Sequence, residues 1–170
     1  MSERAARPLS GSRRSRRSRR SVIAAGLAIA VAALAGAPRP ARADVTADCD
    51  FLEISARTGE PPAIDGELRP LEKKLKKPPF SAWNQFKLLG HTQKALAKKK
   101  PEPLGLKTGS ATATLVETVD KSKVRLTVTI DDAKGKRVVN NTTAVEAGDY
   151  VIYGYPLPGN EGHLLSVTCK

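Results

Sequence analysis

Residues 123–130, KVRLTVTI, constrain the fold most, because every second residue is Val, Leu, Val or Ile and the residues between them are polar. In a β-strand successive side chains point to opposite faces, so this alternation predicts a strand with one buried face and one face in water. Residues 111–115 alternate in the same way, and the polar break at 120–122 allows the two runs to pair as a hairpin.

More short strands are expected on both sides of this hairpin. The sequence DDAKG at 131–135 predicts a turn that leads to Val138 and Val139, and turn-forming residues also precede DYVIYGY, 149–155, and HLLSVTC, 163–169. CDFLEISA, 49–56, supplies an early strand. Short strands separated by turns about every ten residues predict an all-β protein, either an antiparallel β-sandwich or a Greek-key-like barrel, with one short helix.

The chain has two cysteines, Cys49 and Cys169, near the two ends of this strand-rich region. In an oxidising compartment this placement predicts one disulfide that joins the terminal segments. The alternatives are two free thiols or a metal site. A metal site would need more ligands than two distant cysteines and two scattered histidines, so we expect neither a metal nor another cofactor.

The first 43 residues have the organisation of a signal peptide. An Arg-rich stretch precedes an uncharged run of 16 residues, 22–37, and Ala41-Arg42-Ala43 provides an A-x-A site that predicts cleavage before Asp44. The alternative is an uncleaved anchor, but the run is shorter than the roughly 20 residues that span a bilayer. We therefore expect no transmembrane segment in the mature chain and a location in the periplasm or outside the cell. Arg19-Arg20 fits a twin-arginine signal as well as general secretion.

The predicted leader carries most of the basic charge. It holds ten Arg and one Glu, and thus nine of the twelve net positive charges of the chain. The remainder has an ordinary charge balance, so the high net charge does not indicate binding to nucleic acid.

The length of residues 44–170 predicts a single domain. Within it, residues 61–107 are rich in Pro and Lys, and we expect this segment to be irregular. Within this segment Leu68, Leu71 and Leu75 have helical spacing, and Pro78-Pro79 would end the helix. The stretch from Trp83 to Leu89 is interpreted as a segment that packs on the sheet, and AKKKPEP, 97–103, as an exposed loop.

Two groups of side chains are candidate ligand contacts. The first group consists of lysines that could meet in space, and it could bind anionic envelope polysaccharide or lipid headgroups. Its members are Lys73, Lys74, Lys76, Lys77, Lys98, Lys99 and Lys100. Tyr153 and Tyr155 project from one sheet face near Tyr150, and they could stack on sugars if exposed or belong to the core if buried. A solvated face that balances neighbouring acids is the alternative for the lysines.

No catalytic residue is predicted. His91 and His163 have no carboxylate at a telling spacing, and His163 reads as a half-buried residue at a turn. We interpret Asp131 and Asp132 as turn residues. Neither cysteine is predicted to be a nucleophile, because both are expected to form the disulfide.

The segments around Leu71–Leu75, Pro78–Ser81 and Phe86–Leu89, with the closing LPGNEGHLLSVTCK, resemble small exported proteins of the myxobacterial kind. The resemblance implies an exported β-rich domain and adds no activity. We expect a non-enzymatic binding or structural protein of the periplasm or cell surface, or alternatively a module for envelope polysaccharide or glycolipid that uses the lysines and tyrosines.

Overall fold

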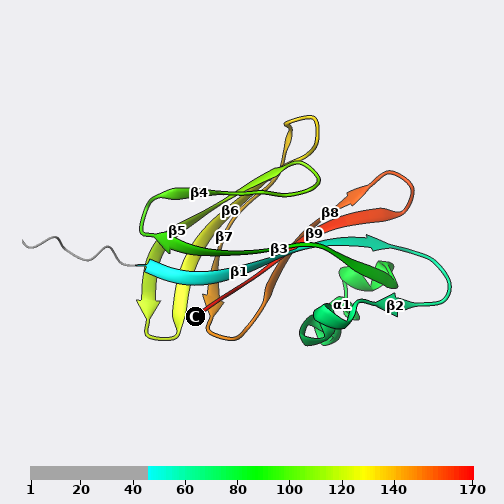
Figure 1. Ribbon diagram of the computed structural model, residues 1–170, viewed down its shortest axis with the longest axis horizontal. Helices are drawn as coiled ribbons and strands as arrows, with labels where there is room; N and C mark the ends of the chain where they lie inside the picture. The colour runs from blue at the N-terminus through cyan, green and yellow to red at the C-terminus, as the bar shows by residue number, and fades with distance from the viewer. Residues whose placement is uncertain (1–45) are drawn as a thin grey trace, which may run out of the picture. The chain divides into compact units, whose positions relative to one another are not determined.

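A computed structural model describes residues 46–170, which belong to one compact unit and form an all-β sandwich of two sheets (Figure 1). The strands are β1 (Thr46–Arg57), β2 (Ala63–Ile64), β3 (Gln85–Ala97), β4 (Pro101–Leu104), β5 (Ser110–Asp120), β6 (Lys123–Asp131), β7 (Arg137–Glu146), β8 (Val151–Leu157) and β9 (Glu161–Cys169). Sheet A has the order β2-β3-β1-β9-β8 and sheet B the order β4-β5-β6-β7. All pairings are antiparallel except β2 with β3.

The predicted hairpin is confirmed as β5 and β6, in which Leu115 lies opposite Leu126. The alternating apolar residues of β6 are all buried between the sheets, and the residues between them face outward. The other predicted strands correspond to β1, β7, β8 and β9. The period-2 pattern works here because sheet B has one face in the core and the other in water.

The predicted disulfide is confirmed. Cys49 of β1 lies opposite Cys169 of β9, with their Cα atoms 4.1 Å apart. Both side chains are buried in the core between the sheets, where they tie the first described strand to the last.

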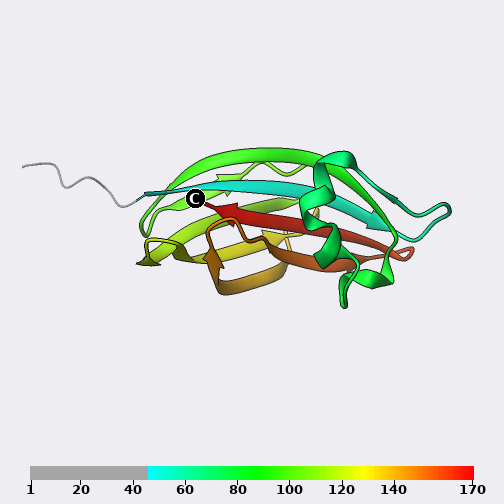
Figure 2. The ribbon, with the colours of Figure 1, turned by 90° about the horizontal axis from the view of Figure 1, so that it is seen from below.

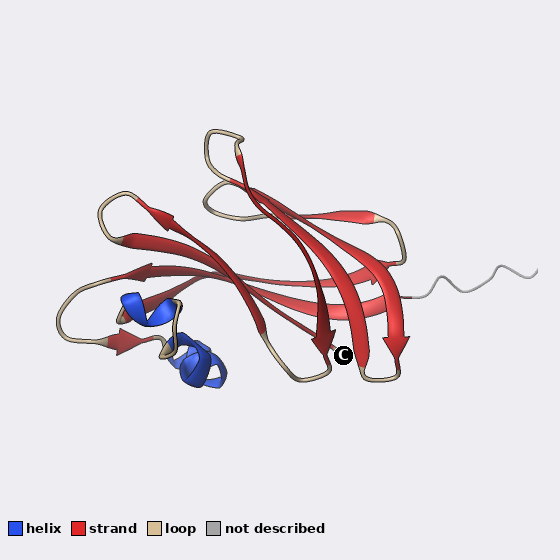
Figure 3. Ribbon diagram, turned by 180° about the vertical axis from the view of Figure 1, so that it is seen from behind, coloured by secondary structure: helices blue, strands red, loops and turns tan. Residues whose placement is uncertain are grey.

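Sheet A is covered on one face and, at one end only, on the other face. Sheet B covers one face, and three short helical elements cover part of the other: η1 (Gly66–Leu71), α1 (Glu72–Leu75) and η2 (Phe80–Ala82) (Figure 2). Leu68, Leu71 and Leu75 are fully buried in this second apolar cluster, as their spacing predicted, although most of the predicted helix has 3-10 geometry. Figure 3 shows that the helical elements lie at one end of the sheet.

The prediction that 61–107 are irregular is wrong for the second half of that segment. β3 has 13 residues and is the longest strand, and β4 occupies part of the stretch predicted as an exposed loop. β3 does not alternate cleanly because its outer edge is open and the helical elements cover only one end of it. Its pairing with β1, rather than its own pattern, makes it a strand.

Candidate binding groove

A groove of about 500 Å³ lies between the helical elements and the β2 edge of sheet A. Its lining combines aromatic and aliphatic side chains with polar and charged ones, and it consists of Pro62, Ala63, Ile64, Arg69, Glu72, Lys76, Ser81, Trp83, Asn84 and Phe86. Ligand sites in proteins have volumes of roughly 300–1,000 Å³ and a similar mixture of apolar surface with a few polar groups. The groove therefore has the size and composition of a small-ligand site.

The leucines of the helical elements decide which residues face this groove. Leu71 and Leu75 point into the apolar cluster on sheet A, where they pack with residues such as Ile54. On a short helix the residues between such positions face away from the sheet. Glu72 and Lys76 therefore stand at the rim of the groove, one turn apart.

The strand side of the groove is held by side-chain amides. Asn84 Oδ1 accepts a hydrogen bond from the Gly59 N–H at 2.9 Å. Gln85 Oε1 accepts one from Arg57 Nε at 2.7 Å, and Gln85 Nε2 donates to the Pro61 carbonyl at 2.7 Å. These bonds fix the β1–β2 connection against the start of β3, so the wall is built before a ligand arrives.

Trp83 is the aromatic residue that gives the groove its shape. Its indole ring covers Gly162 of β9 so closely that a Cβ at Gly162 would lie 2.4 Å from the ring atom Cζ2. Gly162 is therefore required at this position by close packing. Trp83 is half-buried and also packs against the apolar cluster, which leaves part of the ring available to the groove.

The charge at the rim is partly neutralised. Lys76 Nζ forms an ion pair with the carboxylate of Glu72, and this hydrogen bond, with the charge of Lys76, holds the pKa of Glu72 below its usual value. Glu72 is the only carboxylate among the lining residues, and the lining contains neither histidine nor cysteine. The groove thus offers stacking, hydrogen bonds and the positive charge of Arg69, and it lacks a pair of groups for acid–base chemistry.

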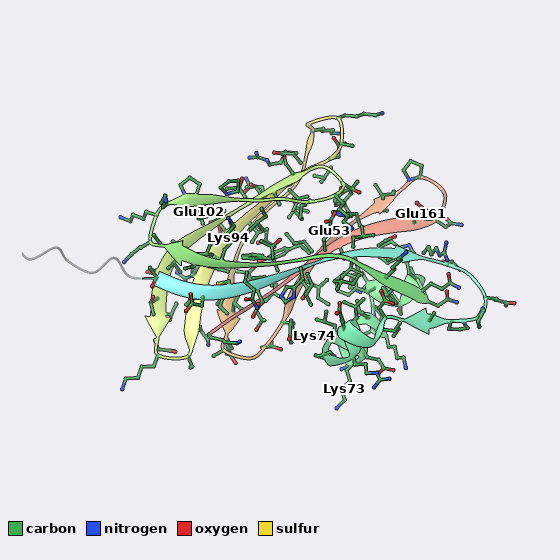
Figure 4. All side chains as sticks on the ribbon, viewed as in Figure 1. Glu53, Lys73, Lys74, Lys94, Glu102 and Glu161 are labelled. Atoms are coloured by element: carbon green, nitrogen blue, oxygen red, sulfur yellow. A yellow bond between two sulfur atoms is a disulfide. The ribbon has the colours of Figure 1, made fainter. Side chains whose placement is uncertain are left out.

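The structure does not bring the two lysine groups together. Lys73, Lys74, Lys76 and Lys77 lie on and after α1, which packs on β1 near Ile54, whereas Lys98 follows Ala97, the partner of Thr46 at the other end of β1. At about 3.3 Å per residue, the eight steps along β1 from Thr46 to Ile54 separate the groups by about 26 Å. Figure 4 shows Lys73 and Lys74 beside α1, far from Lys94 and Glu102. The idea that the two groups form one patch is therefore wrong.

Several of these lysines have acidic partners. Lys74 Nζ lies 2.7 Å from Asp149 Oδ1 and also donates to the Tyr150 carbonyl, which fastens α1 to the β7–β8 connection. The hydrogen bond from Lys74 lowers the pKa of Asp149. Lys100 pairs with Glu102 at 2.9 Å. In the first group, Lys73 and Lys77 have no ion pair within residues 46–170.

Tyr153 and Tyr155 share one face of β8, as expected, and this face points into the sandwich. The two side chains are 5% and 7% exposed, so the structure decides for the core and against stacking on sugars. Burial raises the pKa of both hydroxyls, and the negative charges of Asp132 and Glu53 add to the effect at Tyr155.

His163 is not the half-buried turn residue that its place in the sequence suggests, since it is 1% exposed. Its Nε2 lies 2.8 Å from Oε1 of Glu53, which is equally buried and lies inside the sandwich in Figure 4. The carboxylate also accepts hydrogen bonds from the backbone N–H groups of Lys107 at 2.8 Å and Thr108 at 3.0 Å. The ring of Tyr155 packs edge-on against the imidazole at 5.3 Å. This cluster holds the β4–β5 loop and is closed to a substrate.

The second histidine also has a carboxylate partner, but on the surface. His91 Nε2 lies 3.1 Å from Asp50 Oδ1 on the outer face of sheet A. Asp132 is confirmed as a turn residue, because its side chain accepts hydrogen bonds from the N–H groups of Lys134 and Lys136. Within residues 46–170, no three His, Cys, Asp or Glu side chains gather as a metal site would need.

The predicted leader and its cleavage site, Ala41, Ala43 and Asp44, lie outside the residues that the structure describes. Among the described residues, no helix has the length and apolar character needed to cross a bilayer. The disulfide fits a protein of an oxidising compartment.

The fold and the groove define the class of this protein as an all-β, disulfide-linked sandwich with a helical cover on one sheet. Comparison with models of protein families, with curated proteins and with solved structures finds no match for the chain.

The sequence pattern predicted that Trp83 and Phe86 pack on the sheet, and it did not indicate Arg69, Ser81 or Asn84 as site residues. Trp83 is the only tryptophan, and it lies in a segment that also contains Asn and Gln beside a basic helix. That combination of an aromatic residue with flanking amides was the available signal. No signal in the sequence indicated the contact between Glu53 and His163, which are 110 residues apart.

Proposed function

We propose that this protein is an exported, non-enzymatic binding protein of the periplasm or cell surface, and that its ligand site is the groove beside α1. The observation that carries the proposal is the combination of Trp83 and Phe86 with a polar rim in a hollow of about 500 Å³. Export is supported by the leader-like first 43 residues and by the disulfide. The resemblance to small exported proteins stays a prediction that agrees with this assignment.

The ligand class that fits the groove is a saccharide of the cell envelope. An aromatic ring packs well against the apolar face of a sugar, and amide, hydroxyl and guanidinium groups bind its oxygens. Trp83 supplies the ring, while Asn84 and Arg69 supply polar atoms in the same groove. Of the seven lysines considered from the sequence, Lys76 lines the groove, and Lys73 and Lys77 flank it on the same helical segment.

The test is calorimetric titration of the purified protein with oligosaccharides released from envelope polysaccharide, at two salt concentrations. Binding should be lost in Trp83→Ala and weakened in Arg69→Ala. Arg125→Ala is the matched control, because Arg125 is an exposed arginine on sheet B that pairs with Glu117. We expect its affinity to be unchanged.

Vesicles of anionic phospholipid serve as the alternative ligand. Equal binding of vesicles by the Trp83→Ala variant would assign the affinity to surface lysines and remove the groove from the proposal. Absence of oligosaccharide binding by the unaltered protein, or equal binding by the Trp83 and Arg125 variants, would disprove the saccharide assignment.

A further inference from the structure

Among residues 46–170, nothing pairs with the outer edge of β3 in the middle of its length. It pairs with β1 from Gln85 to Ala97, but on its other side β2 pairs only with Gln85 and Phe86. An uncovered strand edge presents unpaired backbone N–H and C=O groups to any further strand.

The register identifies the residues whose backbone groups point outward. The Lys170 N–H donates to the Asp48 carbonyl at 2.8 Å, so Asp48 directs its backbone toward β9. Backbone directions alternate along a strand. Cys49 and Phe51 therefore face β3, where their partners are Lys94 and Thr92.

The residues of β3 between these partners consequently point away from β1, and they are His91, Gln93 and Ala95. Within residues 46–170, no backbone or side-chain group forms a hydrogen bond with the N–H or C=O of these three residues. All three are exposed. They present three N–H donors and three C=O acceptors at alternate positions.

The free edge has definite ends. At one end a β-bulge opposite Glu53 and Ile54 interrupts the register, and Asp65 Oδ2 accepts the hydrogen bond of the Leu88 N–H at 2.8 Å. At the other end the Ala97 carbonyl accepts from the Lys100 N–H in the turn toward β4. A partner strand can therefore pair with three outward residues and no more.

Within residues 46–170, the other edges of the two sheets differ from the middle of β3 in containing proline or in contacting the facing sheet. β4 contains Pro101 and Pro103, and β8 contains Pro156, which cannot donate to an added strand. β7 contacts β8 and β9 on the open side of the sandwich. The middle of β3 contains no proline.

We propose that the protein forms a homodimer in which β3 pairs antiparallel with β3 of a second copy, about a two-fold axis at Gln93. Gln93 then faces Gln93, and His91 faces Ala95 in both directions. These three pairs use all six outward N–H groups of the two strands in N–H···O=C bonds.

The charges of β3 fit pairing with itself. In this register Lys94 faces Thr92 of the second copy, so no like charges are opposed along the paired stretch. His91 already has the carboxylate of Asp50 beside it in its own chain. The dimer joins two copies of sheet A into one continuous sheet.

The first experiment is sedimentation equilibrium of the purified protein between about 1 µM and 1 mM, the range expected for a small interface. Gln93→Pro removes one outward N–H per copy without touching the bonds to β1, because proline is tolerated at an edge with its nitrogen turned away from the ladder. The loss of two bonds should raise the dissociation constant roughly 30-fold. Gln93→Thr keeps the backbone N–H and should leave the dissociation constant of the dimer unchanged.

The second experiment is independent of the proline variant. Residues that face each other in a hydrogen-bonded pair have Cα atoms about 5.5 Å apart, which is within disulfide range. Gln93→Cys should form a disulfide-linked dimer, whereas Asn141→Cys, exposed on β7, should not. A protein that stays monomeric at all concentrations, a dimer that Gln93→Pro does not weaken, or equal cross-linking of both cysteine variants would overturn the proposal.

Discussion

The buried pair of Glu53 and His163 allows a quantitative test of the structure through Glu53→Gln. The carboxylate accepts hydrogen bonds from Lys107 N–H, Thr108 N–H and His163. A glutamine has one oxygen instead of two and carries no charge. In either orientation of the glutamine amide, its NH₂ group would replace one carboxylate oxygen. At least one of the three donors would therefore lose its acceptor.

The expected loss follows from these contacts. An unsatisfied buried donor costs roughly 1–3 kcal/mol, and a bond to a neutral acceptor is weaker by about 1 kcal/mol than a bond to a charged one. One orientation of the amide leaves one donor unsatisfied and two bonds weakened, and the other leaves two donors unsatisfied and one bond weakened. In either case we expect the free energy of unfolding to fall by at least about 3 kcal/mol. That is a large share of the roughly 5–15 kcal/mol that stabilises a domain.

The matched control is Asp50→Asn, because Asp50 also pairs with a histidine at 3.1 Å, but the His91 side chain is 47% exposed. Exposed ion pairs contribute roughly 0–1 kcal/mol. Urea unfolding, followed by circular dichroism and by the fluorescence of Trp83, measures both variants. If Glu53→Gln loses no more stability than Asp50→Asn, then the carboxylate does not hold the β4–β5 loop in the way described.

Three further outcomes follow from the same contacts. Replacing both Cys49 and Cys169 by Ala should lower the free energy of unfolding by about 4–5 kcal/mol on the chain-entropy model, since the bond closes a loop of 120 residues; a urea midpoint equal to that of the unaltered protein would contradict this. Gly162→Ala should displace the indole that covers Gly162, cost roughly 1–3 kcal/mol and shift the tryptophan emission; an unchanged spectrum and stability would show that the ring is not packed there. Asp149, whose pKa is lowered by Lys74, contributes stability that is complete above its unfolded pKa of about 3.9 and is lost as the pH falls through the lower folded value. In Lys74→Met the unfolding free energy should therefore decrease less between neutral and acidic pH than it does in the unaltered protein. The difference should be less than about 1 kcal/mol, because the Lys74–Asp149 pair is exposed. A larger decrease in the variant than in the unaltered protein would refute the role of this pair.

The sequence alone was sufficient for strands β5, β6 and β7 of sheet B and for the disulfide, but not for β4, which lies in a stretch predicted as a loop. The alternation in β6 follows directly from the two-residue period of a strand with one dry face, so it needs no knowledge of distant partners. The burial of Leu68, Leu71 and Leu75 could likewise be predicted from their spacing, because a short helix must bury its apolar side.

Tertiary structure decided the features that depend on which segments meet. β3 is a strand because β1 pairs with it, and its open edge leaves no clear apolar pattern to recognise. Tyr153 and Tyr155 point inward because β8 presents that face to sheet B, a direction that a two-residue spacing does not specify.

The candidate site belongs to the same category. The groove requires Arg69 of the helical segment and Trp83 beside β3 to lie against the β2 edge of sheet A, and the two lysine groups are kept apart by the length of β1. Local sequence fixes the period of each element, because side-chain direction depends only on backbone geometry. The neighbours of each side chain depend on strand order and register, which only the folded chain determines.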